Sequence, residues 1–420
     1  MQPKGTARIA VIGFGPRGLG ALEALSQRLK STDRRVQIDI YEPGPYPGAG
    51  PNFAPSEPAY CLLNIPYRDI AIRPPQGTTV GRFAEWQDQP IDPDSFPSRA
   101  DMGRYLNARW DDLFAQGFKK TGATLRLIPA QVSRISRKGS GWCVESKSGA
   151  EAVYNEVLLT LGQPPVEADA QWAGWQDHAA QTKAEVAQAY PAAALGEQAA
   201  GWQGKQVAIR GLGLSTYDVL RSLTTAQGGG FDPAGYHASG REPSRILPFS
   251  LNGQPPFPKP GNAALDALFE PLSEETAHFI QAATAAVSAG PKVAPSLISG
   301  AMVPVVARIL GPQNVSEAEV AEWLETEWSD PGAQDRLPPM DALRYGIDLA
   351  VGEVAKPGLR ARAGLAQMAG SMARGLQSGP RNPGDGKAVD RLRRGAKAVF
   401  LRAAPVLGAR NAGPYRRGIG

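Results

Sequence analysis

The chain has 420 residues, of which 42% are hydrophobic, and it contains two cysteines and three histidines. At about 150 residues per domain, this length predicts two or three domains with ordinary cores. The few cysteines argue against a disulfide framework, the scattered histidines against a metal site, and the lack of a run of about 18 apolar residues against a membrane span. We therefore expect a metal-free cytoplasmic protein.

The net charge of +5 is concentrated at one end of the chain. Residues 356–420 contain 14 Lys and Arg against 2 Asp and Glu, a net charge of +12, which leaves −7 for the rest. A basic tail can bind nucleic acid or anionic lipid. This tail lacks interleaved aromatic residues and a helical charge pattern, so we expect a solvated segment and no nucleic-acid or membrane partner.

The first predicted unit is a buried strand over residues 9–12, a glycine-rich turn and an amphipathic helix. The turn, VIGFGPRGLG, matches G-x-G-x-x-G through Gly13, Gly15 and Gly18. The first glycine permits a tight turn, the second lets the backbone approach a pyrophosphate, and the third lets the helix pack on the strand. Amides at the helix N-terminus would then face the phosphates.

A second strand, RVQIDIYE, ends at Glu42. An acidic side chain there can accept both hydroxyls of an adenosine ribose and disfavours a 2′-phosphate, which favours FAD or NAD over NADP. Pro16 supplies a helical φ at a position whose N–H needs no helical partner. Because GxGPxG resembles the flavoprotein form of the motif, we assign this loop to FAD. A structural turn without a ligand is the alternative.

A further apolar strand, YNEVLLTLG, ends at Thr160 and Gly162, and the following Gln-Pro-Pro stops any helix. This segment resembles the one that closes the FAD-binding region of two-dinucleotide flavoproteins, where the strand end and the glycine pass near the cofactor. The preceding stretch, GWCVESKSGAEAVYNEVLL, predicts a hairpin that leads into this strand.

The stretch KQVAIRGLGLSTYDVLRSL repeats the order of strand, glycine turn and helix. A strand over residues 207–210 precedes Gly211 and Gly213, and Thr216 stands at the third motif position. Small hydroxyl residues or alanine are typical of NADP-binding loops at that position. The apolar side of the predicted helix carries Leu214, Val219 and Leu223.

The next strand candidate, GYHASGREP, carries Ser239 and Arg241 where an NAD-specific site would carry an acid. A guanidinium can bind a 2′-phosphate bidentately, so these residues favour NADPH. Thr216 and the insertion TAQGGGFDPAG both depart from an ordinary site. The alternative is a Rossmann-like half retained for structure, without nicotinamide.

The remaining chain predicts helices and a poorly patterned end. LSEETAHFIQAATAAV and SEAEVAEWLETEW predict helices with serine N-caps and acids in the first turn, as a cover near the substrate pocket. From about Lys397 onward apolar periodicity stops, so we expect no packed element there, and the composition is that of a shifted reading frame. We divide the chain into a FAD-binding domain (1–165), a helical connection (166–204), an NAD(P)-binding half (205–250), a helical cover (251–355) and a basic tail (356–420).

Five stretches, in this order, resemble the FAD/NAD(P)-binding group that contains the FAD-dependent urate hydroxylase and the nitrosuccinate-forming aspartate N-monooxygenase: VIGFGPRGLGALEAL, YEPGPYPGAGPNFAPSEPAYCLLNIP, LLTLGQPP, RGLGLSTYDVL and ASGREP. The resemblance covers roughly residues 8–250. It implies an α/β fold with two dinucleotide-binding, Rossmann-like halves and helical additions. It also implies FAD and NAD(P)H as cofactors, and oxygen captured at the flavin to hydroxylate a small polar substrate.

By position, the resemblance implies that Arg17 joins the motif glycines at the FAD pyrophosphate and that Asn64 lies against the isoalloxazine side. A turn residue is the alternative for Asn64. Arg99, Arg104 and Tyr105 are candidates to line the flavin side, or else form a solvated helix start. No catalytic side chain is identified, because the flavin itself carries out the redox chemistry. The functional alternatives are a flavin oxidoreductase without oxygenation and a truncated, inactive relative.

Overall fold

The computed structural model describes most of the chain up to residue 352, in the following ranges: 5–72, 78–162, 167–232, 234–251, 253, 255–256, 258–268, 270–290, 292–330 and 338–352. The chain forms two compact units. The first comprises Met1–Ile209 and Leu214–Leu247, and the second comprises Arg210–Gly213 and Pro248–Gly420. The expectations for the basic tail, including the segment from Lys397 onward, lie outside the described residues. The five-part domain division stays a prediction.

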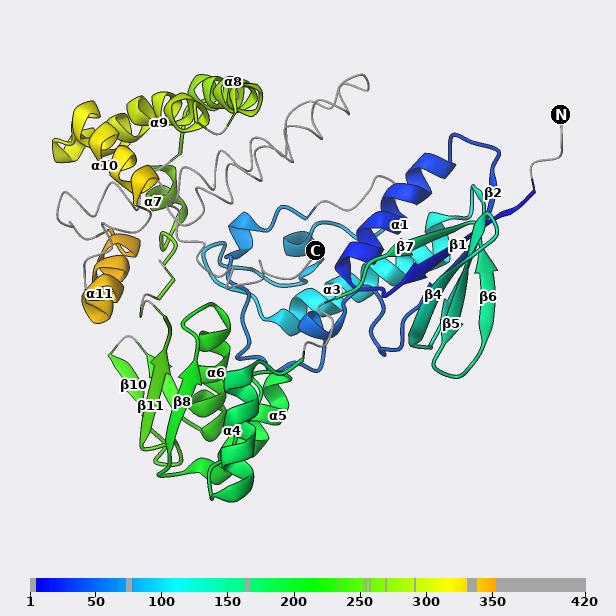
Figure 1. The fold of residues 1–420 in the computed structure, drawn as a ribbon, viewed down its shortest axis with the longest axis horizontal. Coiled ribbons are helices and arrows are strands. Elements are labelled where there is room, and N and C mark those ends of the chain that lie inside the picture. The colour runs from blue at the N-terminus through cyan, green and yellow to red at the C-terminus, as the bar shows by residue number, and fades with distance from the viewer. Residues whose placement is uncertain are drawn as a thin grey trace. The chain divides into compact units, whose positions relative to one another are not determined.

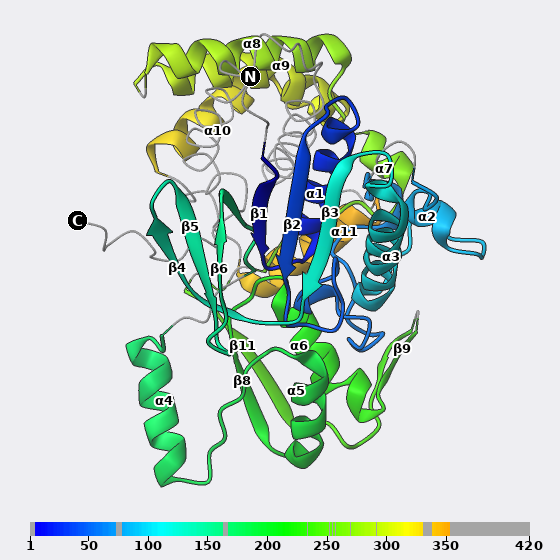
Figure 2. The same cartoon turned by 90° about the vertical axis from the view of Figure 1, so that its right-hand side faces the viewer.

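The first unit is built on a parallel sheet (Figure 1). Its strands are β1 (Ala7–Ile12), β2 (Arg35–Tyr41), β3 (Gly122–Ile128) and β7 (Glu156–Leu159), in the order β3-β2-β1-β7. All three pairings are parallel, and Figure 2 shows β1, β2 and β3 side by side. Helix α1 (Pro16–Leu29) connects β1 to β2. This sheet confirms the predicted α/β fold class.

The central strand β1 is covered on both faces, so its last three residues, Ala10, Val11 and Ile12, are all buried and apolar. Val11 and Ile38 pack in one cluster with residues of α1 and of helix α3 (Arg99–Asp112). Ala10 and Ile12, which point to the opposite face, pack against a second, antiparallel sheet. Because side chains alternate along β1, this strand packs against α1 and α3 on one face and against the antiparallel sheet on the other.

The antiparallel sheet contains β4 (Val132–Lys138), β5 (Gly141–Ser146) and β6 (Glu151–Tyr154), in that order. Strands β5 and β6 form a hairpin that leads into β7, as the sequence predicts. Strand β4, which pairs with the other edge of β5, was not predicted. The chain therefore crosses from β3 to β7 through a three-stranded sheet.

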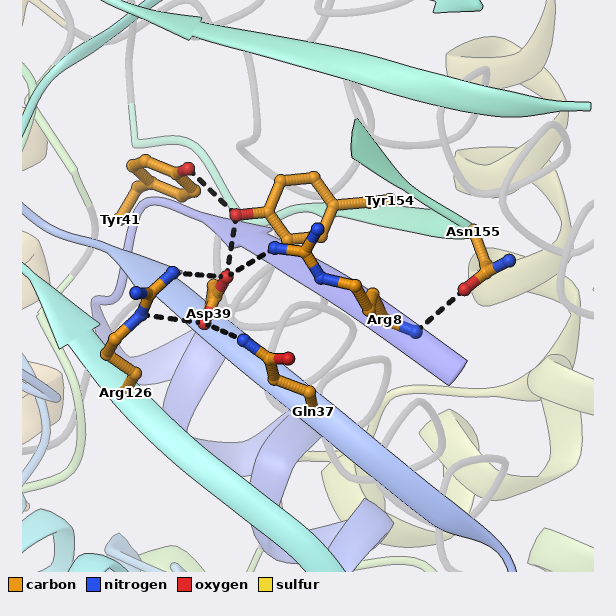
Figure 3. Close-up of polar contacts among 7 residues, drawn as sticks. All are labelled: Arg8, Gln37, Asp39, Tyr41, Arg126, Tyr154 and Asn155. Carbon is orange, nitrogen blue, oxygen red and sulfur yellow. Dashed lines mark hydrogen bonds and ion pairs between the residues drawn. The ribbon is translucent and has the colours of Figure 1, made fainter. Parts of the chain in front are cut away.

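A buried carboxylate joins the two sheets (Figure 3). Asp39 of β2 is 0% exposed and accepts hydrogen bonds from Arg126 Nε and Nη2 at 3.0 and 2.8 Å. The hydroxyl of Tyr154, on β6, also donates to it at 2.8 Å, and Arg8 Nη2 lies at 3.4 Å. Burial raises the pKa of Asp39, but the hydrogen bonds from Arg126 and Tyr154 outweigh burial and hold it below its ordinary value.

Helix α3 contains a glycine where a loop crosses it. A Cβ added to Gly103 would lie 1.6 Å from the carbonyl oxygen of Phe53, so any side chain there would displace the loop backbone. Gly103 therefore lets the loop around Phe53, which follows β2, lie directly against α3.

Shorter helical segments occur at Pro51–Phe53, Tyr67–Asp69, Phe83–Trp86, Leu113–Gly117, Ala200–Trp202, Thr225–Gln227 and Gly311–Gln313.

The second glycine motif also lies between a strand and a helix, β8 (Gln206–Arg210) and α6 (Ser215–Leu223). Val219 and Leu223 are buried as predicted, whereas Leu214 is 48% exposed and does not belong to the apolar side. The predicted helical connection contains α4 (Ala170–Gln181) and α5 (Ala192–Ala199). Helix α5 shares one core with β8 and α6, formed by Leu195, Ala199, Trp202, Ile209, Val219 and Leu223.

The strand expected over GYHASGREP differs from its prediction. Only Gly235–His237 forms a strand, β10, and it pairs with β9 (Gly230–Asp232) in a separate antiparallel ribbon. Strand β8 pairs instead with β11 (Arg245–Phe249). Ser239 and Arg241 therefore follow a short ribbon rather than a strand beside β8.

The described part of the second unit contains helices α7 (Ala263–Ala267), α8 (Ser273–Ala289), α9 (Ala294–Leu310), α10 (Glu317–Ser329) and α11 (Pro339–Ala350). Helices α8, α9 and α10 share one apolar core. Helix α9, which contributes most of that core, was not predicted. No helix in the described ranges has the length and apolar character needed to cross a bilayer.

The two predicted serine caps in this unit had different outcomes. Ser316 caps α10, since its Oγ accepts from the Glu319 amide at 3.3 Å while Glu319 accepts from the Ser316 amide at 2.8 Å. The cap at Ser273 was wrong, because α8 already begins at that residue. There the Glu275 carboxylate accepts from the Leu272 amide at 2.7 Å and satisfies the helix start without serine.

Candidate functional site

The first glycine motif forms a tight turn between β1 and α1. Gly13 has φ of 80°, a left-handed conformation that favours glycine. Its amide donates to the carbonyl of Tyr41 at 2.9 Å, and an added Cβ would lie 3.1 Å from the carbonyl oxygen of Thr160. Gly13 therefore ends β1 in a position that no larger residue could take without strain.

The N-terminus of α1 lacks a side-chain cap. Gly15 is the N-cap residue, Pro16 follows at the first helical position, and no acidic residue lies in the first turn. An added Cβ on Gly15 would meet only Gly50, with the Cα atom at 3.7 Å, and Gly50 itself has φ of 68°. Two glycines thus face each other beside amides that no side chain caps, an arrangement that fits a bound phosphate.

The third motif glycine packs against the end of β7. An added Cβ on Gly18 would lie 2.8 Å from Phe14 Cδ2 and 3.0 Å from Thr160 Oγ1. The Thr160 hydroxyl donates to the carbonyl of Gly13, and the Thr160 amide donates to the carbonyl of Ile12 at 3.0 Å. Thr160 therefore ties the closing strand to the first loop. An added Cβ on Gly162 would meet nothing within 4 Å, and the Gln-Pro-Pro exit lies outside the described residues.

The carboxylate of Glu42 lies against the first loop. One oxygen accepts from the Phe14 amide at 2.6 Å, and the other accepts from the Gly44 amide at 2.8 Å. A carboxylate has about four acceptor positions, so two remain for ligand hydroxyls. The structure places Glu42 beside the loop, and its contact with a ribose stays a prediction.

The other residues expected on the flavin side have different environments. Arg17 and Asn64 are exposed, and Asn64 lies in a bend. Tyr105 is 0% exposed and donates its hydroxyl to the carbonyl of Gly81, so it belongs to the core and does not line a cofactor site. Arg104 pairs with a neighbouring carboxylate on the surface of α3. Arg99 is paired with Asp218 of α6.

The second glycine motif shares the strand-to-helix geometry. Gly211 has φ of 118° and donates its amide to the carbonyl of Phe249 at 2.7 Å, while Gly213 is half-buried. Helix α6 begins without a side-chain cap. Thr216 is buried at 6% exposure, so its small side chain faces the protein interior.

Ser239 and Arg241 lie together in the segment that follows β10. Ser239 Oγ donates to the carbonyl of Gln227 at 2.8 Å and accepts from the Arg241 amide at 3.2 Å. The Arg241 guanidinium lies against Gly228, where an added Cβ would come within 2.2 Å of Nη2. The structure therefore brings these two predicted residues together.

Sequence reasoning missed Glu242, the acid that shapes this loop. Its carboxylate accepts from the Tyr236 hydroxyl at 2.5 Å and from the amides of Ser239 and Gly240 at 2.7 and 2.8 Å. These hydrogen bonds, the one from Tyr236 first, lower the pKa of Glu242 to about 2. The sequence signal for its role was an acidic residue directly after Ser-Gly-Arg.

Within the described ranges, no cluster of His, Cys, Asp and Glu could hold a metal ion.

Two relatives match a similar share of the chain. The nitrosuccinic acid synthase npaA of Aspergillus oryzae is 28% identical over 277 residues, which is 60% of this chain and 41% of the relative. The L-aspartate N-monooxygenase (nitrosuccinate-forming) of Streptomyces davaonensis is 28% identical over 289 residues, which is 59% of this chain and 44% of the relative. The chain thus spans less than half the length of either relative.

Solved structures give weaker matches. The FAD-bound cadaverine monooxygenase DfoA of Erwinia amylovora superposes with a TM-score of 0.36 at 17% identity, covering 53% of this chain and 49% of that one. A flavin-containing monooxygenase of Stenotrophomonas maltophilia gives a TM-score of 0.29 at 18% identity, with coverages of 50% and 52%. A family model adds a match to residues 10–164. The model is that of an FAD-NAD(P)-binding family, and the matched stretch contains the first glycine motif, Glu42 and Thr160.

Proposed function

We propose that this protein is an FAD-dependent monooxygenase that uses NADPH to hydroxylate a small polar substrate. The observation that carries the proposal is the N-terminus of α1, without a side-chain cap, where Gly15 faces Gly50 beside the Glu42 carboxylate. A bound flavin would supply the redox chemistry, in which the substrate, one dioxygen, NADPH and one proton yield the hydroxylated product, NADP⁺ and water.

Residues of the first unit would bind the adenine end of FAD. The amides of the first turn of α1 and the helix dipole stabilise the negative charge of a pyrophosphate. Gly13 and Gly15 leave room for the phosphates, and the exposed Arg17 adds a positive charge. Glu42 would accept hydrogen bonds from the ribose hydroxyls with the acceptor positions that Phe14 and Gly44 leave free. Asn64 would lie on the isoalloxazine side.

We further propose that the substrate carries an amino group, as the aspartate accepted by the monooxygenase relative does. Placement in the group that also contains the FAD-dependent urate hydroxylase remains a prediction. The relatives support this substrate class, whereas the geometry at the start of α1 supports cofactor binding.

The purified protein tests the cofactor proposal and the reaction separately. We expect a visible flavin spectrum, loss of that absorption when NADPH is added without oxygen, and NADPH oxidation with hydroxylation when oxygen and a small amine or amino acid are supplied. A colourless protein that takes up no added FAD would contradict the whole proposal. Quantitative conversion of oxygen to hydrogen peroxide with every amine tested would show an oxidoreductase without oxygenation.

Arg241→Ala should weaken NADPH binding far more than NADH binding. We expect the KM for NADPH to rise roughly 10- to 100-fold, the effect of removing one hydrogen bond to a charged group, while the KM for NADH changes little. Steady-state kinetics with both coenzymes measure this difference. Arg245→Ala, which changes an exposed arginine four residues away, is the control. An equal loss with both coenzymes would show that Arg241 does not bind the 2′-phosphate.

A further inference from the structure

A buried carboxylate on α6 ties this helix to α3 within the first unit. Asp218 is 3% exposed, and its Oδ2 accepts from Arg99 Nη2 at 2.6 Å. The Tyr190 hydroxyl donates to the same oxygen at 2.5 Å. Arg99 belongs to α3 and lies 119 residues from Asp218 in sequence, so this contact joins two distant parts of the first unit.

Arg99 lies where its positive charge is unfavourable without a negatively charged partner. Arg99 is the first residue of α3, directly after the N-cap Ser98, where a positive charge opposes the helix dipole. Its side chain is only 20% exposed, so water compensates little of its charge. Arg99 Nε also donates to the carbonyl of Leu62, at 3.4 Å, but Asp218 supplies the opposite charge.

The surrounding contacts between the two parts are polar as well. Arg221 Nη1 donates to the carbonyl of Tyr60 at 3.3 Å, and Ser222 Oγ donates to the Tyr60 hydroxyl at 3.5 Å. The apolar core around α6 is separate from the core around α1 and α3. An interface of this kind resembles a transient protein interface, so individual polar contacts decide how the two parts are aligned.

We propose that Asp218 is a positioning residue that fixes α6 on the FAD-binding domain and thereby sets the rate at which NADPH reduces the flavin. This inference rests on the proposed function. Helix α6 starts two residues after Gly213, so a shift of the helix also shifts the end of the second glycine motif. Buried ion pairs add little net stability, but they can specify one arrangement over others. Small errors in alignment are costly for a transfer between two bound cofactors.

The experiment measures flavin reduction in single-turnover, oxygen-free mixing. With Asp218→Asn, we expect normal FAD content but a reduction rate at saturating NADPH that is roughly 10- to 100-fold lower. Reduction by dithionite should be unchanged, because a small soluble reductant needs no alignment of α6. Asp232→Asn, which changes an exposed carboxylate on β9, is the matched control and should behave as the wild type.

A double-mutant cycle separates positioning from a general loss of structure. If Arg99 and Asp218 act as one unit, Arg99→Gln combined with Asp218→Asn should reduce the rate no further than Asp218→Asn alone. Tyr190→Phe, which removes one hydrogen bond and keeps the ion pair, should give a smaller loss and remains informative if Asp218→Asn fails to fold. If the rate losses of the two single variants add up in the double variant, or if Asp218→Asn or Tyr190→Phe keeps the wild-type rate, the positioning role is overturned and the proposed function is not affected. If the wild-type protein binds FAD but NADPH does not reduce the bound flavin, the proposed function is overturned as well.

Discussion

Gly15→Val is expected to abolish FAD binding while the protein stays folded. Gly15 has φ of −86° and ψ of −162°, an extended conformation that valine readily adopts, and an added Cβ would make an ordinary contact with Gly50 at 3.7 Å. The branched side chain would nevertheless fill the space where a phosphate must approach the amides of α1. We expect FAD content to fall below detection, with a melting temperature close to that of the wild-type apoprotein.

Gly20→Val is the matched control for this variant. Gly20 lies in the same helix and is exposed, and an added Cβ there would meet nothing within 4 Å. This variant should bind FAD normally. Gly18→Val should differ from both, because its Cβ would clash with Phe14 and Thr160 and so destabilise the fold itself. Normal flavin content in the Gly15→Val protein would refute the assignment of the loop.

Asp39→Asn is expected to lower the free energy of unfolding by about 2–4 kcal/mol at pH 7, the range for removing a buried, hydrogen-bonded charge. The amide cannot accept all the hydrogen bonds that Arg126 and Tyr154 donate to the carboxylate. Arg126 is 58% exposed and can be solvated instead, which keeps the loss below that of a fully buried ion pair. Urea unfolding monitored by tryptophan fluorescence measures the difference.

The same variant should change how stability depends on pH. The pKa of Asp39 in the folded protein lies below its ordinary value of 3.8, so the carboxylate stabilises the fold above that value. This contribution disappears as the pH falls through the lowered pKa of the folded state. The difference in free energy of unfolding between the wild type and Asp39→Asn should therefore be largest near neutral pH and should shrink as the pH falls below about 4. Asp33→Asn, at an exposed position, should leave the pH profile unchanged.

The sequence predicted the elements around the first glycine motif well because their signals are local. The apolar strand before Gly13, the proline at the helix start and the hairpin before Thr160 each lie within about 20 residues of chain. The structure bears out these elements, including the first helical position of Pro16. The loop that faces this motif carried a weaker signal, the two glycines of YPGAGP, of which Gly50 lies opposite Gly15.

The features that escaped prediction depend on contacts between distant residues. Strand β8 takes β11 as its neighbour rather than the nearer GYHASGREP, and pattern alone does not choose between two short strand candidates. Gly103 looks like an unfavourable residue inside a helix, and only the carbonyl of Phe53 explains it. Arg126 and Tyr154 likewise lie 87 and 115 residues from Asp39, and Arg99 lies 119 residues from Asp218.

The strand order of the parallel sheet has a consequence for synthesis of the protein. Strand β1 is made first, yet Ile12 pairs on one side with Tyr41 and on the other with Leu159. At about 5–20 residues per second, roughly 6–24 s separate the emergence of these two partners from the ribosome. During this interval the hydrogen-bonding groups along one edge of β1 have no strand beside them, a condition that favours pairing with other chains. Binding of a chaperone to the nascent chain should therefore matter most before residue 156 has emerged.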